Sequence, residues 1–287
     1  MPQGYAIDKM KIVKQQYIAA LKQLGTLGGG NHFIEIQKSN EGILWIMIHS
    51  GSRNFGLKVA EYYNTLAKTI NTKRFSVNLV DPKADLAYLP DDIPEAYEYF
   101  QEMKYCTDFA LANRKLMMKR IQEILIQYLP EVKFESLSYK DQNQREVMAP
   151  TMINIAHNYA ANETHFNTEV ILHRKGATSA KKGEIGIIPG SQGTKSYIVE
   201  GLGNEESFMS CSHGAGRVMS RKAAQKNLNL HEEVKKLDDL GIIHSIRTAN
   251  DLDEAASCYK DISQVMDLQS DLVRILVELT PLAVVKG

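Results

Sequence analysis

The residues with the clearest chemical potential lie at 207–221, where His213 sits in a small-residue stretch, Ser-Cys-Ser-His-Gly-Ala-Gly. An apolar run at 208–211 precedes it, and residues 217–226 contain neither Gly nor Pro, so we predict a strand, a turn and a helix. Such a turn presents backbone N–H groups to a phosphate at the positive end of the helix dipole. Arg217 and Arg221 would then lie one helical turn apart behind His213. The alternative is a strand end that carries a histidine by chance.

Two further histidines stand at the ends of neighbouring predicted strands. A glycine-rich turn at 26–30 leads through Asn31 and His32 into a strand at 33–37, and a second apolar strand at 43–48 ends at His49. A hairpin centred on Asn40 places His32 opposite Ile48 or His49, where Cβ atoms are about 5 Å apart. Two imidazoles at this separation can share a metal ion. The competing interpretation is a pair of ordinary polar residues at strand ends.

A third candidate ligand, His157, is followed by Asn158 in an apolar stretch at 152–160 that reads as helix-like. Burying an imidazole and an amide without partners costs a few kcal/mol, and a metal or a ligand would provide partners. His165 and His173 are weaker candidates, because their polar neighbours favour a solvated surface. His231 and His244 have no ligand-like setting.

Hydrophobic spacing predicts the elements that position these residues. Helices are expected at 7–24, 57–70, 95–129 and 262–279, strands at 170–172, 185–188 and 196–199, and irregular segments at 72–94 and 131–150. The alternation indicates an α+β fold with central mixed or antiparallel sheets. We predict a single domain over residues 1–287, with a helical excursion at about 57–135.

Composition narrows the class of protein. The 287 residues are 44% hydrophobic and carry no formal net charge, so a nucleic-acid partner would need a local basic patch. The densest such cluster runs from His173 to Lys182, although charge runs are usually solvated surface. Three widely spaced cysteines suit a reducing compartment, and no stretch resembles a signal peptide or a membrane span, so a soluble, cytoplasmic protein is expected. Together, three candidate metal histidines, two glycine turns and scattered basic residues favour metal-assisted nucleotidyl or phosphoryl transfer.

The motifs, taken in order, resemble one family closely. They are GTLGGGNHFIEI at 25–36, HSGSR at 49–53, HNY at 157–159, RKGAT at 174–178, GIIPGSQGTKSYIV at 186–199 and SCSHGAGRVMSR at 210–221. This set is similar to the RtcB family of RNA-splicing ligases over about residues 25–286. The resemblance implies a distinctive α+β fold and an enzyme that uses GTP and Mn²⁺. The reaction it implies joins RNA 3′-phosphate or 2′,3′-cyclic phosphate ends to 5′-hydroxyl ends, in tRNA splicing or RNA repair.

The resemblance also implies residue roles. His213 matches the nucleophile that carries GMP, and His32, His49 and His157 match the manganese ligands. Arg53, Lys175, Arg217 and Arg221 match phosphate or RNA contacts. Residues that match positions around the guanylate are Asn31, His32, Phe33, Ile34, Glu35, His157, Asn158, Pro189, Gly190, Ser191, Gln192, Ser196, His213, Gly214, Ala215, Gly216 and Lys286.

Two departures from the family pattern affect this expectation. Gln192 stands where the family commonly has methionine, which should only modulate nucleotide fit. The Asp-x-Gly-Cys-Gly motif that normally supplies two further metal ligands before the glycine turn is not found, so we expect an N-terminally truncated chain. Such a chain would be an RNA ligase whose activity on its own is uncertain. If it is half of a split enzyme, an N-terminal partner chain would complete it. The alternatives are an incomplete RNA- or nucleotide-binding fragment and a metal-dependent phosphoesterase.

Overall fold

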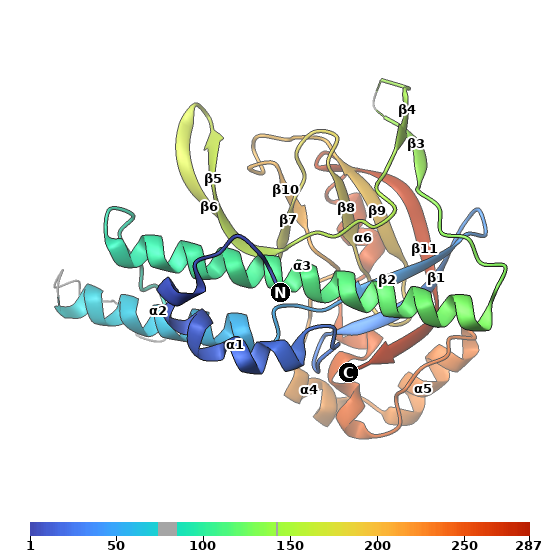
Figure 1. Ribbon diagram of the computed structural model, residues 1–287. Helices are drawn as coiled ribbons and strands as arrows, with labels where there is room; N and C mark the ends of the chain where they lie inside the picture. The colour runs from blue at the N-terminus through green and yellow to red at the C-terminus, as the bar shows by residue number, and fades with distance from the viewer. Residues whose placement is uncertain (74–84, 142) are drawn as a thin grey trace. The chain divides into compact units, whose positions relative to one another are not determined.

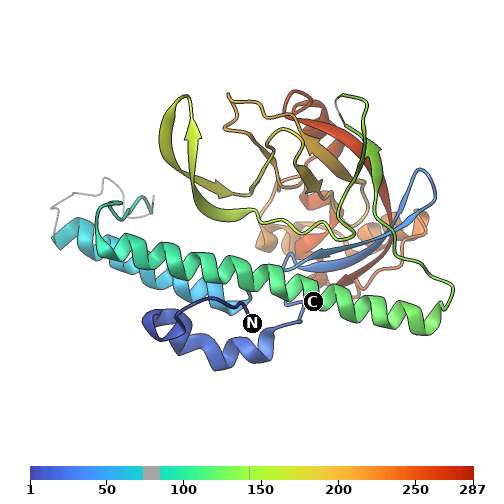
Figure 2. The same ribbon diagram turned by 45° about the horizontal axis from the view of Figure 1, so that its top comes forward.

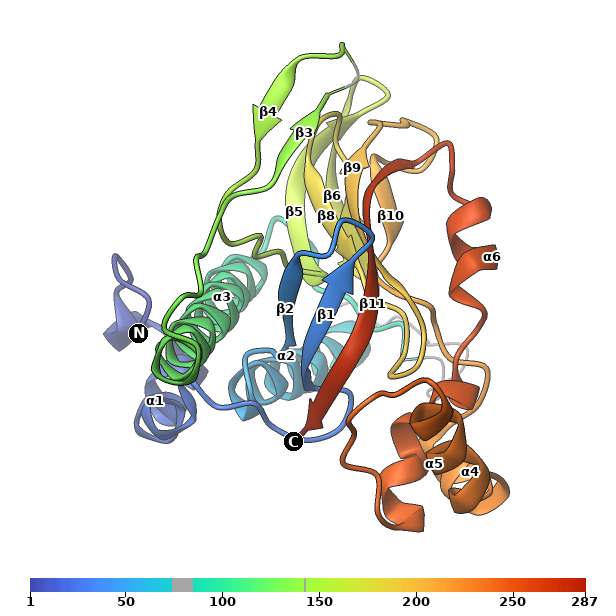
Figure 3. The same cartoon turned by 90° about the vertical axis from the view of Figure 1, so that its right-hand side faces the viewer.

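A five-stranded antiparallel sheet carries several of the predicted site residues. The computed structural model describes residues 1–73, 85–141 and 143–287, and the sheet order within it is β2-β1-β11-β9-β8 (Figures 1 and 3). The strands are β1 (Phe33–Ser39), β2 (Leu44–His49), β8 (Ile185–Ile188), β9 (Ser196–Gly201) and β11 (Val273–Lys286). All four neighbouring pairs are antiparallel. The predicted α+β class is therefore confirmed.

The strand β11 replaces the predicted C-terminal helix. Residues 262–279 were expected to be helical, but α6 covers only Ile262–Asp267 and the chain becomes extended from Val273. β11 pairs with β1 along one edge and with β9 along the other, so its backbone finds hydrogen-bond partners on both sides. Val277 and Leu279 are buried on one face, while Ile275 and Leu282 on the other face are partly exposed, so apolar residues occur on both faces and hide the alternation of a strand.

The β1–β2 hairpin forms as predicted, but its register differs from the prediction. His49 lies opposite Phe33 and Ile48 lies opposite Ile34, so His32 precedes the paired segment. The turn is centred on Glu41 rather than on Asn40, because Gly42 takes the positive φ of the turn at +87°. The two histidines are therefore diagonal rather than directly opposed.

Residues 152–160 do not form the helix-like segment that was predicted: 152–157 are irregular and 158–160 begin a strand. The strand β5 (Asn158–His165) pairs with β6 (Thr168–Lys175) in a long hairpin that Figure 1 shows as a twisted ribbon, and His157 lies just before its first strand. Burial alternates along the end of β5, where Asn162 and Thr164 are exposed and Glu163 and His165 are covered. His165 is buried rather than solvated, at 4% exposure.

The segment around His213 is less regular than predicted. A three-residue strand, β10 (Ser210–Ser212), pairs with β7 (Ala177–Ser179), and the helix that follows, α4 (Arg221–Asn227), begins only after the N-cap Ser220. The Ser220 hydroxyl accepts a hydrogen bond from the Ala223 N–H. His213 is therefore not at a helix N-terminus, and Arg217 lies outside the helix.

Contacts divide the described residues into two compact units, 1–26 with 50–119, and 27–49 with 120–287. The first unit contains α1 (Lys11–Gln23), α2 (Asn54–Lys73) and most of α3 (Pro94–Tyr128), and α2 and α3 run side by side (Figure 2). These three helices confirm the predicted ones, whereas residues 74–84 of the predicted irregular connection lie outside the described residues. The single-domain organisation remains a prediction.

The first unit has its own core. Phe55, Tyr105 and Phe109 pack together at its centre, each at most 2% exposed. The buried carboxylate of Glu102, on α3, accepts hydrogen bonds from the first N–H groups of α1 and from Tyr63. A carboxylate at this position satisfies donors that have no partner within the helix.

The remaining elements are short. They are η1 (Ile7–Lys9), β3 (Ser138–Lys140), β4 (Glu146–Met148), α5 (Leu230–Asp239), η2 (Ala249–Glu254) and η3 (Ala256–Cys258). The segment 131–150, expected to be irregular, thus contains a small hairpin. No helix in the described part of the chain is both long and apolar enough to cross a membrane.

Candidate functional site

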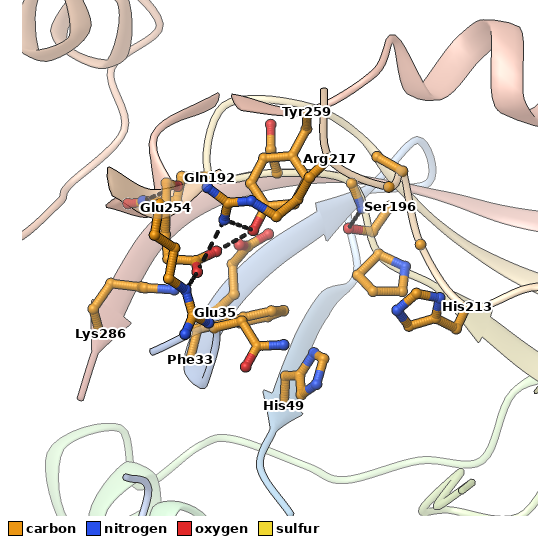
Figure 4. A pocket seen from close by; sticks show the side chains of 18 residues that line it. Phe33, Glu35, His49, Gln192, Ser196, His213, Arg217, Glu254, Tyr259 and Lys286 are labelled. Carbon is orange, nitrogen blue, oxygen red and sulfur yellow. Dashed lines mark hydrogen bonds and ion pairs between the residues drawn. The ribbon is translucent and has the colours of Figure 1, made fainter. Parts of the chain in front are cut away.

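A pocket of about 310 Å³ opens in the second unit, next to the sheet (Figure 4). Strand β1, the loop before β9, the turn after β10, the η2 region and the end of β11 all contribute to it. Its lining consists of Asn31, Phe33, Glu35, His49, Pro189, Gly190, Ser191, Gln192, Ser196, His213, Gly214, Ala215, Gly216, Arg217, Arg221, Glu254, Tyr259 and Lys286. The tertiary structure thus gathers residues that are more than 250 positions apart in sequence.

Strand geometry explains which residues of β1 face the pocket. Phe33 and Glu35 are two positions apart and so lie on the same face, whereas Ile34 belongs to the opposite face. Lys286 is paired with Phe33 across β1 and β11, and its Nζ lies 5.7 Å from the centroid of the Phe33 ring. Strand β11, whose first residues were predicted to be helical, therefore brings Lys286 to the pocket.

Glu35 is held in an environment that disfavours its charge. It is 3% exposed, and one of its oxygens accepts a 2.6 Å hydrogen bond from the Gln37 amide, which also donates to Ser196 Oγ at 3.0 Å. Burial raises the pKa of Glu35 to about 8, opposed by the Gln37 hydrogen bond and by the charge of Lys286. Burial also lowers the pKa of Lys286. In both groups, burial disfavours the charged form.

Two loops meet at the other side of the pocket. The N–H of Ala215 donates to the carbonyl of Pro189 at 3.2 Å, which joins the turn after β10 to the loop before β9. A side chain on Gly190 would lie 2.1 Å from the Lys195 carbonyl, so only glycine fits this tight turn. The N–H of Gly190 donates to Ser196 Oγ at 3.1 Å. These contacts give the glycine loops a defined shape around the pocket.

His213 occupies one end of the pocket, in the turn that follows β10, and Lys286 lies at the other end (Figure 4). A side chain added at Gly176 would lie 3.1 Å from Cε1 of His213, so the backbone of Gly176 packs directly against the imidazole. Burial lowers the pKa of His213, opposed by a hydrogen bond with the Gly176 backbone. The neutral imidazole is therefore the favoured form, and this form is a nucleophile.

The imidazoles of four predicted site residues form a row. Ring centroids are 6.0 Å apart for His32 and His49, 5.2 Å for His49 and His157, and 5.0 Å for His157 and His213. Nδ1 of His32 donates a hydrogen bond to the Leu27 carbonyl at 2.8 Å. In the neutral ring Nε2 is then unprotonated, and its lone pair can bind a metal ion. The sequence prediction that these histidines lie close together is thus supported by geometry.

Neighbouring imidazoles in the row are close to each other in pairs, but they do not form a complete set of metal ligands. Within residues 1–73, 85–141 and 143–287, no group of three or more His, Cys, Asp or Glu side chains is arranged to hold a metal ion. Neutral imidazole is a common ligand for divalent transition metals, so the type of donor fits such an ion. Metal binding by His32, His49 and His157 remains a prediction.

At the end of the pocket away from His213, the buried carboxylate of Glu254 binds Arg217 and Arg221 (Figure 4). Glu254, 2% exposed, accepts from Arg221 Nε at 2.7 Å and lies 3.0 Å from Arg217 Nη1, and it also accepts from the Tyr259 hydroxyl. Arg217 Nη2 donates to the Asp253 carbonyl at 2.6 Å. These arginines were predicted to bind phosphate or RNA, and in the structure their guanidinium groups are paired with protein acceptors (Figure 4).

Glu254 and Tyr259 were missed by sequence reasoning. They lie about forty residues after His213, in a polar stretch with no catalytic motif, and only the packing of η2 and η3 brings them to the pocket. No local sequence signal identified them, because the contacts that join them to Arg217 and Arg221 are between residues more than thirty positions apart.

Several predicted site residues lie outside the lining of the pocket. His32 and His157 belong to the row of imidazoles, Asn158 accepts a hydrogen bond from the Gly176 N–H, and Lys175 is exposed on β6. Arg53 belongs to the first unit, where its Nε donates to Thr26 Oγ1 and its φ is +59°. The roles of all these residues remain predictions.

Comparison with known proteins gives the family. The family model described as tRNA-splicing ligase RtcB matches residues 3–287. The chain belongs to the RtcB family. The RNA-splicing ligase RtcB of Escherichia coli K12 is 42% identical over 267 residues, which cover 93% of this chain and 62% of that protein. The tRNA-splicing ligase RtcB of Nanoarchaeum equitans is 34% identical over 92% of this chain and 60% of its own length.

The chain therefore spans less than two thirds of these relatives. For the tRNA-splicing ligase RtcB of Pyrococcus horikoshii, 31% identical, the matched share of that protein is 33%. The family resemblance inferred from the motifs is confirmed, whereas the activity of the whole relatives comes to this chain only as a proposal.

Proposed function

We propose that this RtcB-family chain acts as a GTP-dependent RNA ligase that joins RNA 3′-phosphate or 2′,3′-cyclic phosphate ends to 5′-hydroxyl ends. The observation that carries the proposal is a partly buried histidine, His213, whose neutral form is favoured, at the end of a pocket that also holds Glu35 and Lys286. Family membership and the names of the relatives give the reaction class.

The first step assigned to this pocket is nucleotidyl transfer. A nitrogen of neutral His213 attacks the α-phosphorus of GTP, an N–P bond forms, and the bond from the α-phosphorus to the bridging oxygen breaks, so that pyrophosphate leaves. The close packing of Gly176 against the ring would hold the imidazole in one orientation. The resulting phosphoramidate would pass GMP to the RNA 3′-phosphate, and attack by the 5′-hydroxyl would then release GMP.

The remaining pocket groups would bind and orient the guanylate. Phe33 offers an aromatic face, Glu35 a carboxyl group and Lys286 an ammonium group at one end of the pocket, while the loop at 189–192 offers backbone groups. Arg217 and Arg221, held by Glu254, add positive charge beside them. We assign the base to the Glu35 and Lys286 end and the α-phosphate to the His213 end.

Manganese belongs to the same proposal. His32, His49 and His157 would hold the ion next to His213, with further ligands from water or phosphate oxygens. Bound there, it would stabilise negative charge that develops on phosphate oxygens.

The test is formation of a covalent nucleotide adduct. The purified chain is incubated with Mn²⁺ and GTP labelled at the α-phosphate, and protein-bound label is measured beside His213→Ala. We expect an acid-labile adduct in the wild type and none in the variant. His173→Ala is the matched control, because this exposed histidine on β6 bonds only locally, to the Ile171 carbonyl, and its adduct should be retained.

Two other results would redirect the proposal. Reversible GTP binding without any adduct, from folded protein, would favour the non-catalytic nucleotide-binding alternative. Release of phosphate from an RNA 3′-phosphate end without joining would favour the phosphoesterase alternative.

A further inference from the structure

The tip of the β5–β6 hairpin has an unusual residue in its turn. Phe166 and Asn167 form a two-residue loop between the paired residues His165 and Thr168, with φ values of +51° and +60°. Two consecutive positive φ angles define a type I′ turn, which favours Asn, Asp or Gly. A phenylalanine at the first of these positions is strained, so its presence calls for a compensating role.

A second strained aromatic residue lies beside it. Phe208 and Met209 have φ values of +52° and +48°, so four of the seven non-glycine residues with positive φ in the described ranges lie in this cluster. The Phe166 and Phe208 rings are 5.6 Å apart at an interplanar angle of 85°, and the two residues are 57% and 40% exposed. The strained backbone thus displays an edge-to-face pair of aromatic rings to solvent.

Buried polar contacts hold this arrangement in place. Arg174, 2% exposed, donates to the Phe208 carbonyl at 3.2 Å and to Ser210 Oγ at 3.0 Å, and its guanidinium pairs with Glu163 at 2.6 Å. The His165 ring lies 5.2 Å from the Phe208 ring. A buried ion pair is a costly way to fix a surface loop, and strained conformations that persist in this way concentrate at ligand-binding positions.

The charges around the aromatic pair nearly balance. Lys175, Lys181 and Lys182 are exposed, but so are Glu169, Glu205 and Glu206. A nucleic acid bound here would therefore gain most of its affinity from base stacking on the rings and little from phosphate neutralisation.

The aromatic pair is connected directly to the candidate nucleophile. Phe208 precedes His213 by five residues, and β10 lies between them, so their Cα atoms are at most about 18 Å apart. At the base of the same hairpin, Lys175 is followed by Gly176, whose backbone packs against His213. A strand of RNA that ends at His213 can therefore reach the aromatic pair within a few nucleotides.

We propose that Phe166 and Phe208 form a stacking site for an unpaired base of the RNA substrate, a few nucleotides from the end that is joined. This inference rests on the proposed ligase function and adds to it a contact for single-stranded RNA outside the nucleotide pocket. Every base has a flat face, so the site would bind single strands with little sequence preference.

The test compares RNA binding by variants that separate stacking from packing. Affinity for a short, fluorescently labelled single-stranded RNA with a 3′-phosphate is measured by anisotropy for the wild-type chain, Phe166→Leu and Phe208→Leu. Leucine keeps apolar volume but offers no aromatic face, so we expect each variant to bind about tenfold more weakly. The dependence of affinity on salt should have the wild-type slope, because no phosphate contact is removed.

Two more variants sharpen the comparison. Phe134→Leu, which changes another partly exposed phenylalanine at 38% exposure, should bind like the wild type. Phe166→Asn places a turn-favouring residue at the positive φ, so it should raise the melting temperature while it weakens RNA binding. If the variant lost binding because it misfolded, both its melting temperature and its affinity for RNA would fall.

The possible results separate this inference from the proposed function. If the wild type forms the His213 adduct and binds RNA, but Phe166→Leu and Phe208→Leu bind RNA as tightly, the stacking site is wrong and the ligase proposal stands. If the wild type binds no RNA, both are overturned. Unchanged RNA binding together with a change from dimer to monomer in sedimentation would assign the aromatic pair to self-association instead.

Discussion

Glu35 in the pocket and Glu163 on strand β5 are both largely buried, yet their surroundings have opposite effects on the pKa. Glu35 accepts its hydrogen bond from the neutral amide of Gln37, and burial raises its pKa to about 8. Glu163 accepts a hydrogen bond from Arg174 and also hydrogen-bonds His165. These contacts, of which the one with Arg174 has the largest effect, lower the pKa of Glu163 to about 2. Burial alone therefore does not set the charge of a carboxyl group, because a hydrogen-bonded cation reverses its effect.

The difference matches two kinds of task. A carboxyl group that is held near its pKa can exchange a proton or a hydrogen bond with a ligand, as expected in a nucleotide pocket. A carboxylate that is locked by a guanidinium fixes backbone geometry, as expected beneath a strained surface loop. Four experiments test this contrast, in order of expected effect.

Removing Arg174 should have the largest effect. Arg174→Met leaves Glu163 buried without its cation and the Phe208 carbonyl without its donor, so we expect the free energy of unfolding to fall by about 3–5 kcal/mol. Urea unfolding followed by the fluorescence of Trp45, the single tryptophan, measures it. The double variant Glu163→Gln with Arg174→Met should recover part of the loss, whereas an equal or larger loss would show that the charge of Glu163 is not the cause.

Glu35 should make the free energy of unfolding depend on pH between pH 4.5 and about 8. The folded-state pKa is raised from 4.5, so over this interval the folded state binds more protons than the unfolded state and stability falls as pH rises. The loss is of the order of a few kcal/mol, and Glu35→Gln should remove this part of the pH dependence. Urea unfolding at pH 5 and pH 8 without nucleotide measures it; identical profiles for both proteins would contradict the raised pKa.

Glu163 should act in the opposite direction at lower pH. Its folded-state pKa is depressed from 4.5 to about 2, so its stabilising contribution is present above 4.5 and is lost as pH falls toward 2. Glu163→Gln should show a flatter acid limb than the wild type when unfolding is followed by circular dichroism at low pH. A steeper acid limb in the variant would show that other carboxylates carry the effect.

Replacing Lys181 should have the smallest effect. Its Nζ lies 3.4 Å from Glu163, but the side chain is 51% exposed, so water already screens this ion pair. We expect Lys181→Met to change the free energy of unfolding by less than about 1 kcal/mol in the urea experiment. A loss as large as that of Arg174→Met would mean that both cations are needed to hold Glu163.

Local sequence patterns predicted the elements whose signal is short-ranged. The helices α1, α2 and α3 have regular apolar spacing, and β1, β2, β8 and β9 are apolar runs bounded by turn residues. The family resemblance implied a set of residues around one ligand, and Phe33, Glu35, Ser196, His213 and Lys286 of that set line one pocket, although their roles remain predictions. The predictions of helices and strands succeeded because hydrophobic period and turn chemistry are properties of neighbouring residues.

Two errors had a common cause. Residues 158–160 and 273–279 were predicted to be helical, and both form strands because a partner strand is available, β6 in the first case and β1 with β9 in the second. Pairing with a distant strand supplies backbone hydrogen bonds that local propensity does not include. In β11 the apolar residues continue onto the exposed face, at Ile275 and Leu282, so the sequence shows no clear alternation to distinguish a strand from a helix.

By itself, the sequence determined the family, the candidate nucleophile His213 and the set of histidines, since these depend on residue type and order. Only the tertiary structure decided that Glu254 and Tyr259 complete the pocket, that the pKa values of Glu35 and Glu163 shift in opposite directions, and that Phe166 contacts Phe208. The physical reason is that desolvation and ion pairing depend on which distant groups surround a side chain, and these neighbours are fixed by packing and not by the local chain.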